Sequence, residues 1–278
     1  MKQFSLEVLY TIIGIGAASG IYLADRFLYL IADNGSYLYE YDIQNQKIAT
    51  TVIFQHSDSG FIPKKKKPDF EAMAYYANKL YIFGSGSTKK RNLMLTIDFH
   101  SKEILATADM RPLYGAMQRL SGIESDDFNI EGVVFTGKKW LFFQRGNGPA
   151  GHNGIFTVIG NNLHEDANLT YRDYQLPDID GVAATFTDAV QVGNQVYFLA
   201  AAENSASVFY DGEITGSSIG RLNLDTMDIE FIKQISATHK FEGITVASET
   251  ADTISFVLCE DNDQKMSQSQ VYRLTLTF

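Results

Sequence analysis

The chain has 278 residues, of which 45% are hydrophobic and 13% aromatic, enough apolar side chain for one large core. Its 23 basic and 33 acidic residues give a net charge of −10, which argues against binding to a phosphate backbone and therefore against a nucleic-acid partner. A single cysteine, Cys259, excludes an internal disulfide framework, and the 5 histidines show no zinc-like spacing.

The first residues of the chain match a signal peptide only in part. An apolar stretch ends in small residues, but Glu7 interrupts it, and Ser19 already belongs to the first copy of a repeat that cleavage would damage. No apolar run approaches the roughly 20 residues needed to span a bilayer. We therefore expect a cytoplasmic protein without a membrane partner, with a periplasmic or secreted location as the alternative.

One segment recurs five times along the chain. Each copy has a polar residue, a small residue, a short apolar strand, a tight polar turn and a second apolar strand. The copies occupy residues 17–34, 69–86, 128–147, 185–204 and 240–263. Their repeated polar positions, 52 to 60 residues apart, are Ser19, Glu71, Glu131, Asp188 and Glu242. A hairpin repeat of this length is the sequence signature of a β-propeller blade.

Each copy continues into further strands with alternating, β-branched or aromatic residues. Third strands are predicted at 37–43, 93–99, 154–160, 219–225 and 270–278, and fourth strands at 47–54, 103–109, 169–176 and 228–235. The last copy has only three strands, whereas residues 4–12 form a strand without a blade. Placing that strand outermost in the fifth blade closes the ring and covers an exposed edge. The sequence therefore predicts an all-β fold, a single five-bladed β-propeller domain of four-stranded antiparallel blades over residues 1–278.

The loops differ between the two faces of the predicted disc. Tight turns join first and second strands, whereas longer polar loops join second and third strands at the face where each first strand begins. Long loops on a rigid scaffold usually carry binding residues, so we expect a small-molecule ligand at this mouth of the channel. The pocket candidates that follow second strands are Asp33, Arg91, Arg145, Glu203, Asp261 and Asp263. Turn formation and salt bridges are the alternative role for each of them.

The five repeated polar residues should meet around the axis of the propeller. Four carboxylates at one place cannot all stay ionised without compensation, and Ca²⁺ accepts six to eight oxygens in irregular geometry. We therefore predict a central calcium held by this ring, with Mg²⁺ or Na⁺ as alternatives. The competing interpretation is that the acids cap backbone N–H groups or are protonated around ordered water.

Three short segments carry a resemblance to a known family. They are KLYIFGSG (79–86), FFQRGN (142–147) and HKFEGITV (239–246). Together with the order of polar residues in the ring, they make the chain similar to the calcium-dependent apyrases, which are calcium-activated nucleotidases with five-bladed propellers. The chain also resembles uncharacterised bacterial propellers with similar repeats.

The resemblance implies a central calcium, because the apyrases surround theirs with a ring ordered hydroxyl, Glu, Glu, hydroxyl, Glu. Asp188 departs from that order by standing where the family has a hydroxyl. The resemblance also implies that Asp33 corresponds to the acidic residue of the family's first blade and that Arg145 contacts a phosphate. The implied activity is metal-dependent hydrolysis of a nucleotide-like or other phosphorylated molecule, in which arginines neutralise charge and a carboxylate orients water.

Two other functions stay open. A glycoside hydrolase would use paired carboxylates such as Glu131, but the first blade opens with Ser19 rather than an aspartate, and Trp140 falls inside a strand. A propeller can also bind a ligand or a protein without catalysis, since fold alone does not settle function. The basic segment Lys64–Lys67 is interpreted as a solvated linker because the whole chain is acidic. We expect a monomer.

Overall fold

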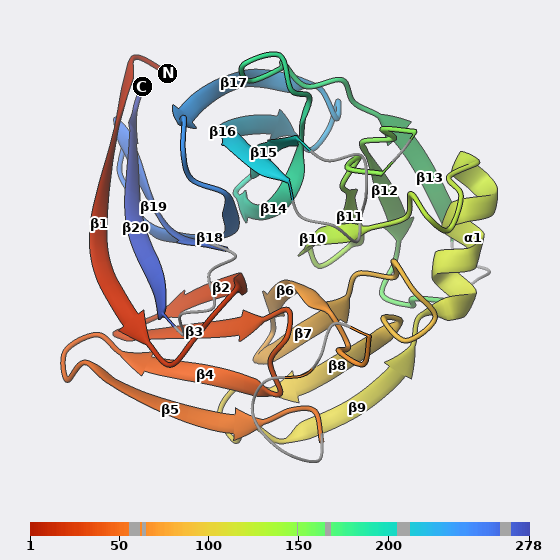
Figure 1. The fold of residues 1–278 in the computed structure, drawn as a ribbon, viewed down its shortest axis with the longest axis horizontal. Coiled ribbons are helices and arrows are strands. Elements are labelled where there is room, and N and C mark those ends of the chain that lie inside the picture. Colours follow the sequence, from red (N-terminus) through yellow and green to blue (C-terminus); the bar gives the residue numbers. More distant parts are fainter. Residues whose placement is uncertain (56–61, 63–64, 149, 165–167, 205–211, 262–267) are drawn as a thin grey trace.

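Five small sheets stand side by side around a central axis (Figure 1). The computed structural model describes residues 1–278 except 56–61, 63–64, 149, 165–167, 205–211 and 262–267. Each sheet has four strands, and every pair of neighbouring strands is antiparallel. The predicted five-bladed propeller of four-stranded blades is confirmed.

In four blades the strands run outward from the axis in chain order, and in the fifth blade β1 is added outside β18, β19 and β20. The innermost strands are β2 (Ala18–Ala24), β6 (Phe70–Tyr76), β10 (Ile130–Phe135), β14 (Ala184–Val192) and β18 (Phe241–Glu249). The second strands are β3 (Phe27–Ala32), β7 (Lys79–Gly84), β11 (Lys139–Gln144), β15 (Gln195–Asn204) and β19 (Thr253–Glu260). The third strands are β4 (Tyr37–Asp42), β8 (Leu93–Asp98), β12 (Gly154–Ile159), β16 (Glu213–Asn223) and β20 (Gln268–Thr277). The outer strands are β5 (Lys47–Val52), β9 (Ile104–Asp109), β13 (Asn168–Asp173), β17 (Ile229–Ser236) and β1 (Gln3–Ile13).

The two ends of the chain close the ring together. Strand β1 pairs with β20 over almost its whole length, from Gln3 opposite Thr277 to Ile13 opposite Gln268. The fifth sheet therefore has the order β1-β20-β19-β18, and the N-terminal strand is its outermost member, as the sequence predicted. This pairing covers the edge that β20 would otherwise expose.

Apolar packing joins neighbouring blades, because their sheets are separate. The innermost strands contact one another in the order β2, β6, β10, β14, β18 and back to β2. Between the second and third blades, Phe83, Phe142 and Phe156 are fully buried in one cluster. Each such side chain contributes roughly 1.5–3 kcal/mol through burial. This packing holds neighbouring blades against each other and thereby positions the side chains near the axis.

One helix was missed by the sequence analysis. Helix α1 (Arg111–Ser121) lies in the linker between the second and third blades and packs Leu113, Tyr114 and Met117 into the core. These residues have helical spacing, but the segment is short. Among the described residues no helix is long and apolar enough to cross a membrane.

Strand β16 begins earlier than predicted. Its first residue is Glu213, six positions before the predicted start, because β15 also continues to Asn204 and the two ends pair with each other. Glu203 lies in this extended end of β15, where it pairs with Ile214, and it belongs to the site described next.

Candidate functional site

Each innermost strand contains a β-bulge that leaves one residue unpaired. In β2, Ala18 pairs with Ala32 and Gly20 pairs with Ile31, so Ser19 between them has no partner in the ladder. The same break occurs once near the start of each of the other innermost strands. The five unpaired residues are Ser19, Glu71, Glu131, Thr187 and Glu242. A bulge re-aims a side chain, and this one places a polar residue of every blade near the axis of the ring.

The fourth blade differs by one residue from the alignment made on the sequence. Asp188 was placed at the repeated polar position, but Asp188 pairs with Leu199, and Thr187 is the unpaired residue. Asp188 occupies the position that Gly132 has in the third blade. Its Oδ2 accepts a hydrogen bond from the N–H of Ile244 in the next blade at 2.8 Å. The ring in space therefore reads Ser, Glu, Glu, Thr, Glu, and a metal-ligating role for Asp188 stays a prediction.

The two hydroxyl members of the ring tie neighbouring blades together. The Ser19 hydroxyl donates to the carbonyl of Phe70 at 2.6 Å, and the Thr187 hydroxyl donates to the carbonyl of Phe241 at 2.7 Å. In both cases the acceptor precedes the bulged glutamate of the following blade. These buried hydrogen bonds fix the backbone directly before Glu71 and Glu242 to the preceding blade.

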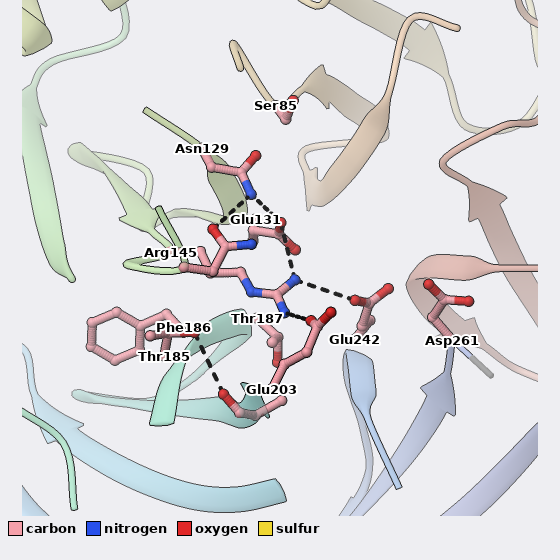
Figure 2. A network of polar contacts seen from close by, with 12 residues as sticks. Ser85, Asn129, Glu131, Arg145, Thr185, Phe186, Thr187, Glu203, Glu242 and Asp261 are labelled. Carbon is pink, nitrogen blue, oxygen red and sulfur yellow. Dashed lines mark hydrogen bonds and ion pairs between the residues drawn. The ribbon is translucent and has the colours of Figure 1, made fainter. Parts of the chain in front are cut away.

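Arg145 lies among acidic side chains from the third, fourth and fifth blades (Figure 2). Its guanidinium is surrounded by three carboxylates, at 3.3 Å from Glu131, 2.6 Å from Glu203 and 3.5 Å from Glu242. Asn129 donates a hydrogen bond of 2.6 Å to the Glu131 oxygen that also faces Arg145. Burial alone would lower the pKa of Arg145, but the three carboxylates raise it overall. The guanidinium is therefore a permanent internal counter-ion for the ring.

Lys240 extends the same network into the fifth blade. Its ammonium lies 2.9 Å from Glu242, 3.4 Å from Glu203 and 3.8 Å from Asp261. Burial raises the pKa of Glu242 well above its usual range despite the nearby lysine. Burial also acts to raise the pKa of Glu203, but Arg145 and Lys240 lower it overall. The two carboxyl groups thus share the same cations, and their pKa values are shifted in opposite directions.

A second cluster occupies the first and second blades' side of the mouth. Asp69 is held by Arg91 and Ser85, whose donors lie 2.7 Å and 2.5 Å from its Oδ2. Its Oδ1 lies 2.6 Å from the ammonium of Lys67, which also contacts Asp33. Asp69 has a left-handed backbone with a φ of 57°, a strained conformation that is concentrated at functional sites.

Glu71 completes this cluster. It is 9% exposed, and among the described residues no hydrogen bond or ion pair reaches its carboxylate. Burial is the main cause that raises its pKa well above the usual range, and Asp69 and Glu131 add to it. Burial likewise raises the pKa of Asp33 to about 6, with Lys67 opposing it. One oxygen each of Asp33, Asp69 and Glu71 lie within 4.8 Å of one another.

These three carboxylates fit a hard cation. Oxygens around one Ca²⁺ at 2.3–2.6 Å lie at most about 5 Å apart, which the cluster satisfies. Asp33 Oδ1 is buried without a hydrogen-bond partner among the described residues. Among the described residues, no other set of three acidic side chains brings its oxygens within 4.8 Å of one another, so Glu131 and Glu242 are not part of this cluster. Arg145 stands between the two last residues instead.

The structure brings together most of the predicted pocket residues. Asp33 and Arg91 belong to the cluster around Asp69, and Arg145, Glu203 and Asp261 belong to the network around Arg145 and Lys240. Asp263 lies outside the described residues. The predicted ring residues are all buried on innermost strands: Ser19, Glu71, Glu131, Asp188 and Glu242. Whether any of them binds a metal stays a prediction.

Several site residues were missed by the sequence analysis. Asp69, Asn129 and Lys240 all stand two positions before the unpaired glutamate of their blades, a signal that a search of the whole repeat would have found. Lys67 was interpreted as part of a solvated linker, and this is wrong. Its neighbours Lys65 and Lys66 are exposed, but Lys67 is only 6% exposed because its ammonium pairs with two aspartates.

Comparison with known proteins identifies a family. Residues 14–276 match a family described as "Family of unknown function (DUF6929)". No curated protein matches the chain.

Solved structures with the same fold are distant in sequence. Myxococcus xanthus glutaminyl cyclase has 9% identity and a TM-score of 0.54, with 97% of this chain and 96% of that chain covered. The α-L-arabinofuranosidase of Podospora anserina has 8% identity and a TM-score of 0.56, with 95% and 92% covered. A luciferin-regenerating enzyme has 8% identity and a TM-score of 0.51, with 98% and 95% covered. At these identities the similarity shows the fold alone.

Proposed function

The chain belongs to the DUF6929 family of unknown function, and from that premise we propose that it is a cation-dependent hydrolase of a phosphorylated small molecule. The cation, calcium by preference, is held at the channel mouth by Asp33, Asp69 and Glu71. The ligand enters at the same face. The apyrase-like order of the ring, now Ser, Glu, Glu, Thr, Glu in space, supports this proposal.

The observation that carries the proposal is the unpartnered Glu71. More than nine-tenths of this residue is buried, its carboxylate has no partner among the described residues, and its oxygen lies within 4.8 Å of oxygens of Asp33 and Asp69. A buried carboxylate without a partner is costly, and proteins resolve this by protonation or by a bound cation. The donor set contains only oxygens, which suits Ca²⁺ or Mg²⁺ rather than a softer metal.

The charges at the mouth explain why a phosphorylated ligand would need the cation. The acids of the two clusters are Asp33, Asp69, Glu71, Glu131, Glu203, Glu242 and Asp261, against the bases Lys67, Arg91, Arg145 and Lys240. Every base already contacts at least one carboxylate. An anion approaching the bare site would therefore meet excess negative charge, and a divalent ion reverses that balance locally.

The network around Arg145 and Lys240 has the residues needed to handle a proton. Burial raises the pKa of Glu242, the neighbouring cations lower the pKa of Glu203, and both side chains contact Lys240 and Arg145. A pair of carboxyl groups with pKa values moved apart is a common arrangement for acid–base chemistry. When bound, the ion would supply Lewis acidity toward a phosphoryl oxygen. The described residues would orient the ligand and hold or move the proton.

Glycoside hydrolysis is the second candidate, because the same carboxyl pair would serve it. A sugar site usually offers an exposed aromatic ring. Trp140 is the protein's one tryptophan, and it is 2% exposed and stacked on Phe135 with ring centroids 4.2 Å apart. It therefore has a packing role, and this candidate ranks behind the first.

The test begins with metal content and thermal unfolding of the purified protein in EDTA, and then with millimolar Ca²⁺, Mg²⁺ or Na⁺. An ion that binds only the folded state stabilises it by about 2.7 kcal/mol at a hundredfold excess over Kd. We expect a rise in Tm with calcium that Glu71→Gln abolishes and that the exposed control Glu249→Gln retains.

Turnover is then measured on nucleotides, aryl phosphates and aryl glycosides, with and without EDTA. Calcium-dependent release of phosphate supports the full proposal. A calcium shift without turnover of any substrate would leave a non-enzymatic binding protein. The absence of both bound metal and a thermal shift would refute the cation site.

A further inference from the structure

Lys67 occupies the position that a cation would take. Its ammonium contacts Asp33 and lies 2.6 Å from Oδ1 of Asp69, the two aspartates of the proposed metal cluster. Its side chain is 7% exposed, and Glu71 is the third carboxylate that acts on it electrostatically. A lysine ammonium is a compact charge on a flexible stem. It can therefore replace a metal ion among carboxylates and also move away from them.

The surrounding residues fix the carboxylate of Asp69. Arg91 and Ser85 hold Oδ2 of Asp69, so that carboxylate cannot rotate and its Oδ1 must face Lys67. Asp33 is 18% exposed at its side chain, so the cluster opens to solvent on that side. The preceding residues Lys65 and Lys66 are exposed, which places the stem of Lys67 at the boundary between the solvent and the buried cluster.

We propose that Lys67 is a displaceable internal counter-ion of the cation site. Its ammonium neutralises Asp33 and Asp69 when no metal is bound, and a divalent ion must displace it to reach the same oxygens. The inference rests on the proposed function, because it assigns a second state to the same cluster. Lys67 then sets the affinity of the site and disfavours monovalent ions, which gain little by replacing one positive charge with another.

Competition of this kind has a direct consequence for binding. Removing the ammonium eliminates both the competition for oxygens and the repulsion between a cation and a neighbouring positive charge. The Lys67→Met variant should therefore bind calcium about tenfold more tightly or better. It should also show a measurable Tm rise with Na⁺. Without any cation it should unfold at a lower temperature, because Asp33 and Asp69 lose their counter-ion.

The experiment is calorimetric titration of calcium into the wild type, Lys67→Met and Lys66→Met. The Lys66→Met control changes an exposed lysine on the same linker and should bind as the wild type does. Tighter binding by Lys67→Met, or binding by this variant alone, supports the inference. Unchanged or weaker binding by a folded Lys67→Met overturns it while the cation site stands. No binding by any of the three proteins overturns the proposed cation site and the inference together.

A second measurement uses the wild type and does not depend on folding of the variant. Lysine acetylation by a reactive ester is followed by mass spectrometry in EDTA and in saturating calcium. Displacement should increase the modification rate of Lys67 severalfold relative to Lys66. An equal rate in both conditions, in protein shown to bind calcium, would refute displacement.

Discussion

Arg145 provides the strongest test of the electrostatics at the channel mouth. The change is Arg145→Met, which keeps the apolar part of the side chain and removes the guanidinium. Three carboxylates within 3.5 Å of it then lose a counter-ion. Removing one partner of a buried ion pair costs about 3–5 kcal/mol, because an uncompensated charge remains.

The structure places the expected loss at the lower end of that range. Glu203 and Glu242 keep Lys240 at 3.4 Å and 2.9 Å, whereas Glu131 is left with the hydrogen bond from Asn129. We therefore expect a loss of about 3 kcal/mol, which lowers Tm by roughly 5 °C in a domain of this size. The loss should be smaller at pH 5 than at pH 8, because buried carboxylates left without a counter-ion take up protons more readily.

The assay is urea unfolding at both pH values, with thermal unfolding as a second probe. Arg172→Met is the control, since this guanidinium pairs with Asp228 at the surface, where both side chains are exposed. The double variant Arg145→Met with Glu131→Gln should recover part of the loss. A stability within 1 kcal/mol of the wild type for Arg145→Met would refute the view that this residue neutralises the ring.

Three further predictions concern residues outside the metal cluster. Burial raises the pKa of Asp188 well above 3.8. The free energy of unfolding therefore falls as pH rises from the pKa of Asp188 in the unfolded chain to its pKa in the folded protein. Asp188→Asn should be more stable than the wild type at pH 8 but not near pH 4, as measured by urea unfolding. Thr187→Val removes the 2.7 Å bond to the next blade and should cost about 1–2 kcal/mol; an unchanged urea midpoint would contradict a role in joining the blades. Gly220→Ala would place a Cβ 2.1 Å from the ring of Phe198, whereas Gly16→Ala meets nothing within 4 Å. We expect a loss of about 1–3 kcal/mol for the first change only, and equal Tm values for both variants would be inconsistent with the packing described.

Local patterns allowed the blades to be predicted because each is built from neighbouring hairpins. Apolar alternation and polar turns repeat five times, so errors of one or two residues in a single copy do not hide the period. The exceptions have local causes. Thr187 and Asp188 are adjacent polar residues, and a bulge shifts the pairing by one residue without leaving a mark in the sequence. Helix α1 was missed because its three buried residues occupy a short segment between two strands.

The sequence by itself determined the five-bladed ring, its closure by the N-terminal strand and the presence of one polar residue per blade near the axis. These features follow from periodicity and strand pairing, which are encoded within each repeat. Only the tertiary structure decided which charges compensate one another. Arg145 meets Glu203 and Glu242 of other blades, and Lys67 turns inward to Asp33 of the preceding blade. Such ion pairs depend on side-chain direction at a bulge and on contacts between distant segments, and neither is visible in a linear pattern.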